Sequence, residues 1–359
     1  MANPDTDQIV DVMPPSQGRE QQHVSYAPAP PITDLAGAHN VFDRIRQRLQ
    51  MSVRGRDTVI EVIIIALLSD GHMLLEDYPG SGKTTLAKAL GDSIIDDNPH
   101  DEIVAFRRIQ FTPDLLPSDV TGTTIFDPNS NRFFFRPGPI FAHVVLADEI
   151  NRTSPKVQSA MLEAMAEKQT TVDNRTRKLD DLFFVIATQN PLDLAGTFPL
   201  PNAQLDRFLF KVRMTHIDRE SELEVLASYK ARRAGAGRDL PRVTRTEILH
   251  ARAVIENAVH VASEVRECLV DVAGKTRSDP RILQGASTRS LVLVMPALQA
   301  RALSKKRDYV TADDVQALGG LIFGHRLELA PGADSMDRVI ADCMAEPLER
   351  LARATMRRR

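Results

Sequence analysis

A short glycine-rich segment constrains the fold of this chain more than any other feature of its sequence. Gly80 and Gly82 are followed directly by Lys83. Residues 72–75, before the segment, read as a short apolar strand, and residues 83–90, after it, read as a helix. A strand, a glycine-rich turn and a helix N-terminus form the context in which a backbone wraps around phosphate groups. The segment therefore predicts a phosphate-binding loop built on a sheet strand.

The residue types in this loop suit the phosphates of ATP. Gly80 and Gly82 let the backbone turn sharply and aim its N–H groups at phosphate oxygens. Lys83 supplies a cation for the β- and γ-phosphates, and the Thr84 hydroxyl is placed to bind Mg²⁺. The first glycine of the strict pattern is replaced here by Asp77. The residues of this loop expected to bind nucleotide are Asp77, Tyr78, Pro79, Gly80, Ser81, Gly82, Lys83, Thr84 and Thr85.

The segments that follow alternate between short apolar strands and helices. The further predicted strands are residues 104–111, 141–147, 182–187 and 208–212. Five short strands with helices between them predict an α/β fold, with a mostly parallel five-stranded sheet covered on both faces in three αβα layers.

The C-terminal part has a different pattern. Helices are predicted at residues 220–233, 245–258, 262–276, 287–304 and 311–319, and no strand is expected after Met214. Thr311 and Asp314 make a capping pair for the last of these helices. The predicted organisation is a proline-rich disordered tail (1–33), a nucleotide-binding core (34–214) and an all-helical lid (215–359).

Two adjacent carboxylates follow the predicted strand at residues 141–147. Asp148 ends a buried strand, where its carboxylate can reach the shell of a bound Mg²⁺. Glu149 is positioned to polarise an attacking water. A lone Asp-Glu pair would usually belong to a solvated turn. About sixty residues after a phosphate-binding loop, the pair instead favours phosphoryl transfer to water.

Three further polar residues are candidates for the same chemistry. Asn190 ends the next buried strand and can hold the water or touch the γ-phosphate, although an Asn before Pro is also a common turn residue. Arg207 precedes the last strand, and we expect it at the carboxyl end of the sheet, away from its own Lys83. Arg289 opens a lid helix and is expected to act on nucleotide in its own subunit. Either arginine is equally explained as a plain surface residue.

Composition narrows the function classes. The net charge is −3, Trp is absent and aromatic residues make up 5% of the chain, which argues against a nucleic-acid-binding surface. The longest apolar run, residues 62–68, is far shorter than the roughly 20 residues of a membrane-spanning helix. Cys268 and Cys343 share no motif and are expected to be reduced thiols. We therefore expect a cytoplasmic protein without membrane insertion and without a nucleic-acid partner.

Several longer segments carry a resemblance to a known family. They are residues 111–122 (FTPDLLPSDVTG), 138–141 (GPIF), 148–152 (DEINR), 158–165 (QSAMLEAM), 187–191 (ATQNP) and 204–208 (QLDRF). As a set, they resemble the signature of the MoxR group of AAA+ ATPases. The resemblance covers about residues 40–330.

The resemblance implies roles for residues at matching positions. Lys83 and Thr84 match the Walker A positions, and Asp148 and Glu149 the Walker B positions. The other matches are Asn190 with sensor 1, Arg207 with an arginine finger acting across a subunit interface, Arg289 with sensor 2, and Val53 and Gly55 with an element near adenine. In that element Arg56 replaces the family's usual Gln, which leaves the adenine contacts open.

The family also carries two β-hairpin insertions, which we expect at residues 125–135 and 170–178. Phe133, Phe134 and Phe135 in the first hairpin either grip a substrate or pack against the core.

The resemblance implies a Mg²⁺-dependent ATPase that remodels, matures or activates a client protein. It implies a homo-oligomeric ring, a hexamer, and a partner or client that carries a von Willebrand factor A domain. The alternatives are the motor subunit of a metal chelatase, a helicase-like motor, and a nucleotide-binding scaffold that does not hydrolyse. Glu149 and Arg207 argue against the scaffold.

Overall fold

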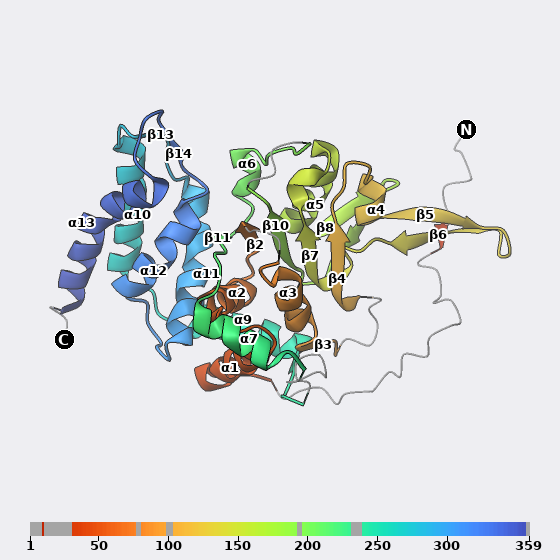
Figure 1. Cartoon of the computed structure of the whole chain (residues 1–359), viewed down its shortest axis with the longest axis horizontal. Coiled ribbons are helices and arrows are strands. Elements are labelled where there is room, and N and C mark those ends of the chain that lie inside the picture. The colour runs from red at the N-terminus through yellow and green to blue at the C-terminus, as the bar shows by residue number, and fades with distance from the viewer. Residues whose placement is uncertain are drawn as a thin grey trace.

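The fold was analysed in a computed structural model that describes residues 9–10, 31–76, 80–97, 103–191, 196–230 and 239–356. Its centre is a sheet of five parallel strands (Figure 1). In spatial order the strands are β11 (Phe210–Arg213), β2 (Met73–Glu76), β10 (Phe184–Gln189), β7 (Ala142–Asp148) and β4 (Val104–Gln110). The predicted five-stranded parallel sheet is therefore confirmed.

The central strands are apolar because both of their faces are covered. All seven residues of β7 and all four of β2 are buried. Successive side chains point to opposite faces, so Val144 and Val145 belong to different halves of the core.

One face of the sheet packs against α1 (Leu35–Ser52), α2 (Asp57–Leu68) and α3 (Lys83–Gly91). The other face packs against α4 (Pro117–Thr121) and α5 (Pro155–Glu167). A one-turn helix, η2 (Ile150–Arg152), follows β7, and α6 (Asn202–Leu205) precedes β11. The three-layer core is therefore present as predicted.

Both predicted hairpins are present. β5 (Gly122–Asp127) pairs with β6 (Arg132–Pro137), and β8 (Gln169–Val172) pairs with β9 (Arg175–Lys178). The β5–β6 hairpin extends away from the body at the end opposite the C-terminal helices (Figure 1). Within the predicted tail, β1 (Ile9–Val10) pairs in parallel with β6, whereas residues 1–8 and 11–30 lie outside the described residues.

The three phenylalanines of the first hairpin have different environments. Phe134 and Phe135 are buried, and Phe135 packs edge-on against Phe141. Phe133 is 46% exposed and stacks with Phe126, which is 48% exposed, at a ring-centroid distance of 5.1 Å. Of the three, Phe133 is the one exposed for the expected contact with a substrate. Phe126, beside it, is exposed as well.

The C-terminal part is helical, as predicted. Its helices are α7 (Arg219–Ala227), α9 (Arg245–Ala258), α10 (Ser263–Ser278), α11 (Thr288–Ser304), α12 (Ala312–Phe323) and α13 (Met336–Met356). The last of these was not predicted. Residues 231–233 of one predicted helix lie outside the described residues. Thr311 and Asp314 form the predicted capping box.

The expectation that strands stop after Met214 was wrong in detail. β12 (Val243–Thr244) pairs with β3 (Ile94–Ile95), and β13 (Ile282–Gln284) pairs with β14 (Glu328–Leu329). Pieces of two or three residues are too short to show a periodicity in the sequence.

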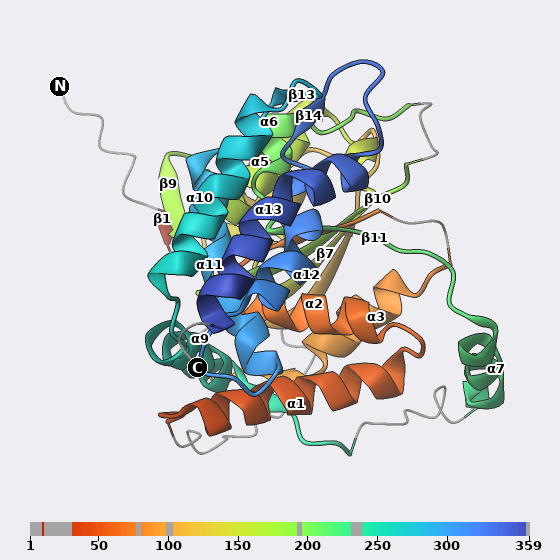
Figure 2. The same cartoon turned by 90° about the vertical axis from the view of Figure 1, so that its left-hand side faces the viewer.

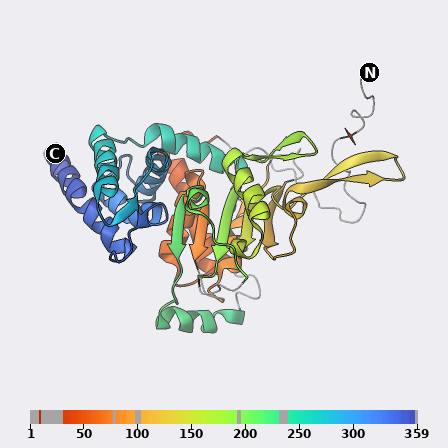
Figure 3. The ribbon, with the colours of Figure 1, turned by 90° about the horizontal axis from the view of Figure 1, so that it is seen from above.

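The C-terminal helices do not all pack alike. α9 packs against α1 of the core, whereas α10, α12 and α13 pack together at the far end of the molecule (Figures 1 and 2). α7 stands off from the body (Figure 3). The predicted domain boundary at residues 214/215 stays a prediction.

No helix in the described part of the chain has the length and apolar character needed to cross a bilayer.

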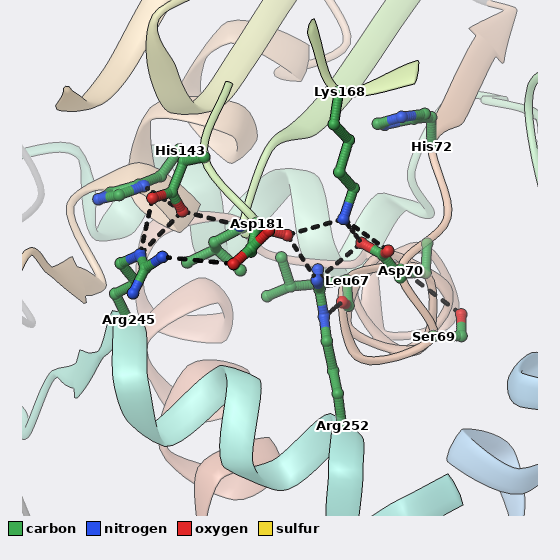
Figure 4. Close-up of polar contacts among 12 residues, drawn as sticks. Leu67, Ser69, Asp70, His72, His143, Lys168, Asp181, Arg245 and Arg252 are labelled. Atoms are coloured by element: carbon green, nitrogen blue, oxygen red, sulfur yellow. Dashed lines mark hydrogen bonds and ion pairs between the residues drawn. The ribbon is translucent and has the colours of Figure 1, made fainter. Parts of the chain in front are cut away.

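A network of ion pairs fixes α9 to the core at the amino edge of the sheet (Figure 4). Arg252 donates to the Asp70 carboxylate at 2.7 Å and to the Leu67 carbonyl at 2.9 Å, and so joins α9 to the end of α2. Lys168, which follows α5, also binds Asp70, at 2.6 Å. The base of the β8–β9 hairpin, α2 and α9 are thereby held together.

A second set of charges in this network surrounds the fully buried His143 of β7. Its Nδ1 lies 3.4 Å from Asp180 and its Nε2 lies 3.6 Å from Asp96. Arg245 Nε of α9 donates to both carboxylate oxygens of Asp180 at 2.8 Å. Burial alone would lower the pKa of His143, but the two carboxylates outweigh it and raise the pKa to about 9. The imidazolium is therefore the form that the fold stabilises.

This cluster predicts a loss of stability in mild alkali. The folded-state pKa of His143 lies above the ordinary value of 6.5, so its contribution is complete below pH 6.5 and is lost as pH rises through about 9. At most roughly 3 kcal/mol is involved, because one pKa unit corresponds to about 1.4 kcal/mol. Urea unfolding from pH 6 to 10 should show a steeper decline for the native chain than for His143→Gln. Parallel declines would contradict the assignment.

Candidate active site

The phosphate-binding loop follows β2 at the carboxyl edge of the sheet. Gly80 and Gly82 have φ angles of 91° and 95°, which lie in the left-handed region that favours glycine. Gly82 is the N-cap of α3, so Lys83 begins the helix and the half-buried lysine lies at its positive end. Thr84 and Thr85 lie exposed in the first turn. Three further predicted loop residues, Asp77, Tyr78 and Pro79, lie outside the described residues.

A buried polar atom in the loop suits contact with a phosphate oxygen. The Ser81 Oγ is buried and has no hydrogen-bond partner among the described residues. Buried hydroxyls are normally satisfied, so an unpaired one beside a glycine-rich turn is what a phosphate oxygen would complete. The loop therefore fits the predicted nucleotide.

A cavity of about 480 Å³ adjoins the loop on the side of α1 and α7. Its lining includes Val53, Gly80, Ser81, Gly82, Thr85, Met214, His216 and Leu226. This volume is within the range of small-ligand pockets. Val53, from the element expected near adenine, thus lies beside the phosphate-binding loop.

Gly55 lies beside this cavity and allows α7 to approach closely. Its φ is 66°, and an added Cβ would lie 2.5 Å from Ser221 of α7. Arg56, which replaces the family's Gln, is buried and donates from Nη1 to the Thr215 carbonyl. Both residues thus connect the end of α1 to the segment after β11.

The two carboxylates after β7 are held in different ways. Asp148 is buried; its Oδ1 accepts a hydrogen bond from the Thr188 hydroxyl at 2.7 Å, and its Oδ2 accepts one from Arg108 at 2.7 Å. Glu149 has a φ of 57°, and its backbone N–H donates to Thr188 Oγ1 at 2.9 Å. The Glu149 carboxylate accepts a hydrogen bond from Gln110 Nε2 at 2.9 Å. One buried threonine therefore orients both members of the acidic pair.

Arg152 also contacts the Glu149 carboxylate. The distance from Arg152 Nε to Glu149 Oε2 is 3.2 Å, and Gln110 approaches the same oxygen from the end of β4. The candidate base is thus held by two side chains at the carboxyl edge.

The end of β10 completes this edge. Gln189 donates to Glu76 Oε1 at 2.7 Å and so connects β10 to the residue that ends β2. Lys211 of β11 binds the same carboxylate at 2.7 Å. Asn190 follows Gln189 and is half-buried beside these groups. The structure therefore brings Lys83, Asp148, Glu149 and Asn190 to one edge of the sheet.

Four residues whose side chains contact the groups of the site were not predicted from the sequence. Gln110 and Arg108 lie on β4, and Thr188 and Gln189 lie on β10. Thr188 left one signal, since it is a hydroxyl residue in an otherwise apolar strand. Nothing local marked Arg108 or Gln110, because their partners lie about forty residues away.

The oxygen atoms at this edge suit Mg²⁺. Thr84 offers a hydroxyl and Asp148 a carboxylate, and Mg²⁺ is commonly held by one or two protein oxygens together with nucleotide phosphates. The described residues contain no group of three or more His, Cys, Asp or Glu side chains arranged to hold a metal by themselves. Arg108, 47% exposed, is the cation now at Asp148. The residues therefore fit a metal brought by a nucleotide.

Arg207 lies at the opposite edge of the sheet. Its Nη1 donates to the Leu162 carbonyl of α5 at 2.7 Å. The backbone N–H of Leu209 donates to the His72 carbonyl, which fixes this segment at the start of β2. The expectation that Arg207 lies at the carboxyl end was wrong, because a residue that precedes a parallel strand lies at the amino edge.

Arg289 lies at the amino edge as well. Its Nε is 3.8 Å from Asp206 Oδ2, next to Arg207 in sequence. The four residues of β2 separate this edge from the phosphate-binding loop by roughly 13 Å at about 3.3 Å per residue. Both arginines thus lie at the edge opposite to the phosphate-binding loop of their own chain, whereas Arg289 was expected to act on nucleotide in its own subunit.

Comparisons with known proteins agree with this architecture. Residues 72–210 match the ATPase family associated with various cellular activities (AAA), and residues 274–342 match the AAA lid domain. A crystal structure of a provisionally assigned ATPase from Cytophaga hutchinsonii has a TM-score of 0.77 and 34% identity to this chain. The match covers 87% of this chain and 95% of that one.

Relatives identified by sequence give the family. The uncharacterized protein YeaC of Bacillus subtilis is 42% identical over 88% of this chain and 97% of its own. Chaperone MoxR1 of Mycobacterium tuberculosis is 35% identical over 84% of this chain and 80% of its own. Protein MoxR of Methylorubrum extorquens is 27% identical over 84% of this chain and 90% of its own. This chain belongs to the MoxR family of AAA+ ATPases.

Proposed function

We propose that this chain hydrolyses ATP with Mg²⁺ and uses the energy to remodel a client protein. The observation that carries the proposal is the convergence of Lys83, Asp148 and Glu149 at the carboxyl edge. When bound, Mg²⁺ would neutralise charge that develops on the phosphates. Thr84 and Asp148 are the residues that would hold it.

Asp148 and Glu149 have different proposed roles in hydrolysis. Asp148 is buried and anchored by Thr188, as suits a carboxylate oriented toward a cation. Glu149 is less buried and, among the described residues, its carboxylate contacts the side chains of Gln110 and Arg152, so it can accept a proton from an attacking water. Asn190, at the end of the neighbouring strand, is positioned to orient that water.

The active site is completed by a neighbouring subunit. Arg207 and Arg289 lie at the edge away from their own nucleotide, where they can neutralise charge on nucleotide bound by the next subunit. A ring, a hexamer, would place each amino edge against the next carboxyl edge. The exposed apolar side chains Leu223 and Leu226 of α7, beside the cavity, support such an assembly.

The client-facing surface is the β5–β6 hairpin. Phe126 and Phe133 form an exposed aromatic pair on it, of the kind that supports contact with another protein. By the family resemblance, we propose a partner or client that carries a von Willebrand factor A domain. A cytoplasmic location is also proposed, and is supported by the two buried, unpaired thiols of Cys268 and Cys343.

The first functional prediction concerns hydrolysis. Lys83→Ala should abolish ATP binding, because it removes the cation at the phosphates. Glu149→Gln should bind ATP yet turn over roughly 10²–10³-fold more slowly, the usual cost of losing one group that acts in the transition state. Phosphate release and binding of a fluorescent ATP analogue would measure both effects, with the exposed Glu349→Gln of α13 as the control. Unchanged turnover in Glu149→Gln would remove Glu149 as the base.

A second prediction is that nucleic acid has little effect on turnover. A chain of net charge −3 has no overall positive charge to attract phosphate backbones. ATPase rates should stay level when single- or double-stranded DNA or RNA is added at low salt. A large stimulation that disappears steeply as salt is raised would favour the helicase alternative.

A third prediction tests the shared site. Arg207→Ala should keep ATP affinity and lose most turnover, since such arginines contribute roughly 10³–10⁵ in rate. Mixing Arg207→Ala chains with Lys83→Ala chains should restore part of the activity, because one chain supplies Arg207 and the other an intact loop. Arg289→Ala should show the same loss of turnover and the same rescue in mixtures as Arg207→Ala. The control is Arg353→Ala, which changes an exposed arginine of α13. Mixed rings that form but stay inactive would contradict the trans role.

A further inference from the structure

Asp206 lies at the centre of a cluster of arginines at the amino edge of the sheet. It directly precedes Arg207 in the chain. Its Oδ1 accepts a hydrogen bond from Arg326 Nε at 2.6 Å, and its Oδ2 lies 3.8 Å from Arg289 Nε. None of these contacts belongs to the nucleotide site at the other edge.

Arg326 clamps the backbone around Arg207 to the lid. Only 2% of its side chain is exposed, and it follows α12 of the lid. Besides Asp206, it donates to the carbonyls of Phe208 at 2.6 Å and Leu209 at 3.2 Å. His325 also contacts the Phe208 carbonyl, at 3.0 Å. The residues that flank Arg207 are thereby fixed to the lid rather than to the nucleotide site of their own subunit.

The two arginines on Asp206 are held with different strength. A buried guanidinium needs its carboxylate partner, because leaving a charge buried and unpaired is costly. Arg289 is 60% exposed, and a long, exposed ion pair contributes little. Arg326 therefore fixes the position of Asp206, and Asp206 in turn presents one oxygen to the exposed Arg289.

We propose that Asp206 is a positioning residue for the two arginines that a subunit donates to its neighbour. Clamped by Arg326, it sets the backbone of Arg207 and orients the Arg289 guanidinium at the same edge. The proposal rests on the trans role proposed above for Arg207 and Arg289. Its distinctive consequence is that Asp206 matters only in the subunit that donates the arginines and not in the subunit that binds the ATP.

Mixed rings separate these two roles. A donor chain carries Lys83→Ala and keeps its arginines, whereas a receiver chain carries Arg207→Ala and keeps its loop. Asp206→Asn is placed in the donor or in the receiver, and steady-state ATPase is measured at saturating ATP. In the donor it should lower the restored rate on the order of tenfold or more, since small misplacements of a catalytic group are costly. In the receiver it should leave the restored rate nearly unchanged.

The controls distinguish the possible failures. Glu349→Gln in the donor should have no effect, and native mass spectrometry verifies that mixed rings form. Equal losses in both placements, or no loss in the donor, would overturn the proposal while the trans arginines stand. An inactive mixture without any Asp206 change would overturn the trans role itself and this proposal with it.

A second variant protects the test against misfolding. Arg326→Lys keeps the positive charge but loses donors to the Phe208 and Leu209 carbonyls. It should show the same dependence on placement as Asp206→Asn. If neither variant enters rings, the cluster is needed for folding rather than for positioning, and the proposal is overturned.

Discussion

All five strands of the central sheet run in the same direction, and this constraint sets at which edge each polar group of the candidate site lies. The carboxyl ends of β2, β7 and β10 meet at one edge of the sheet. The phosphate-binding loop, the acidic pair and Asn190 lie at these three ends. The strand starts meet at the other edge, beside Asp206, Arg207 and the lid. In the function proposed above, these two edges are half-sites, and a second copy of the chain brings opposite halves together on one nucleotide.

Each half-site is held rigid by a buried polar side chain. At the carboxyl edge, Thr188 bridges the Asp148 carboxylate and the Glu149 backbone. At the amino edge, Arg326 ties Asp206 and the backbone of Phe208 to the lid. Because Arg326 bonds both Asp206 and the Phe208 carbonyl, we expect the lid and the segment that carries Arg207 to move together. The network around His143 fixes α9 in a similar way, away from both half-sites.

Much of this structure was predictable because its signals are local. Apolar runs of strand length gave the sheet, and the glycine-rich loop with Asp148 and Glu149 gave the nucleotide site. The partners that hold these groups were not predictable, since Thr188 and Arg326 contact residues forty or more positions away. The edge of Arg207 was misjudged, although a residue that precedes a strand of the predicted parallel sheet lies at its amino edge. α13 was missed although its apolar residues recur at helical spacing, whereas the short strand pairs show no periodicity.

The separation of the half-sites is tested most directly in the assembled ring with ATP bound. A structure of the Glu149→Gln variant, which should retain ATP, would show which chain supplies the guanidinium groups at each γ-phosphate. We predict that Arg207 and Arg289 of one subunit both reach hydrogen-bond distance of the nucleotide held by Lys83 of the next subunit. Arg289 bound to the γ-phosphate of its own subunit, or a γ-phosphate with no arginine from the neighbour, would contradict the account.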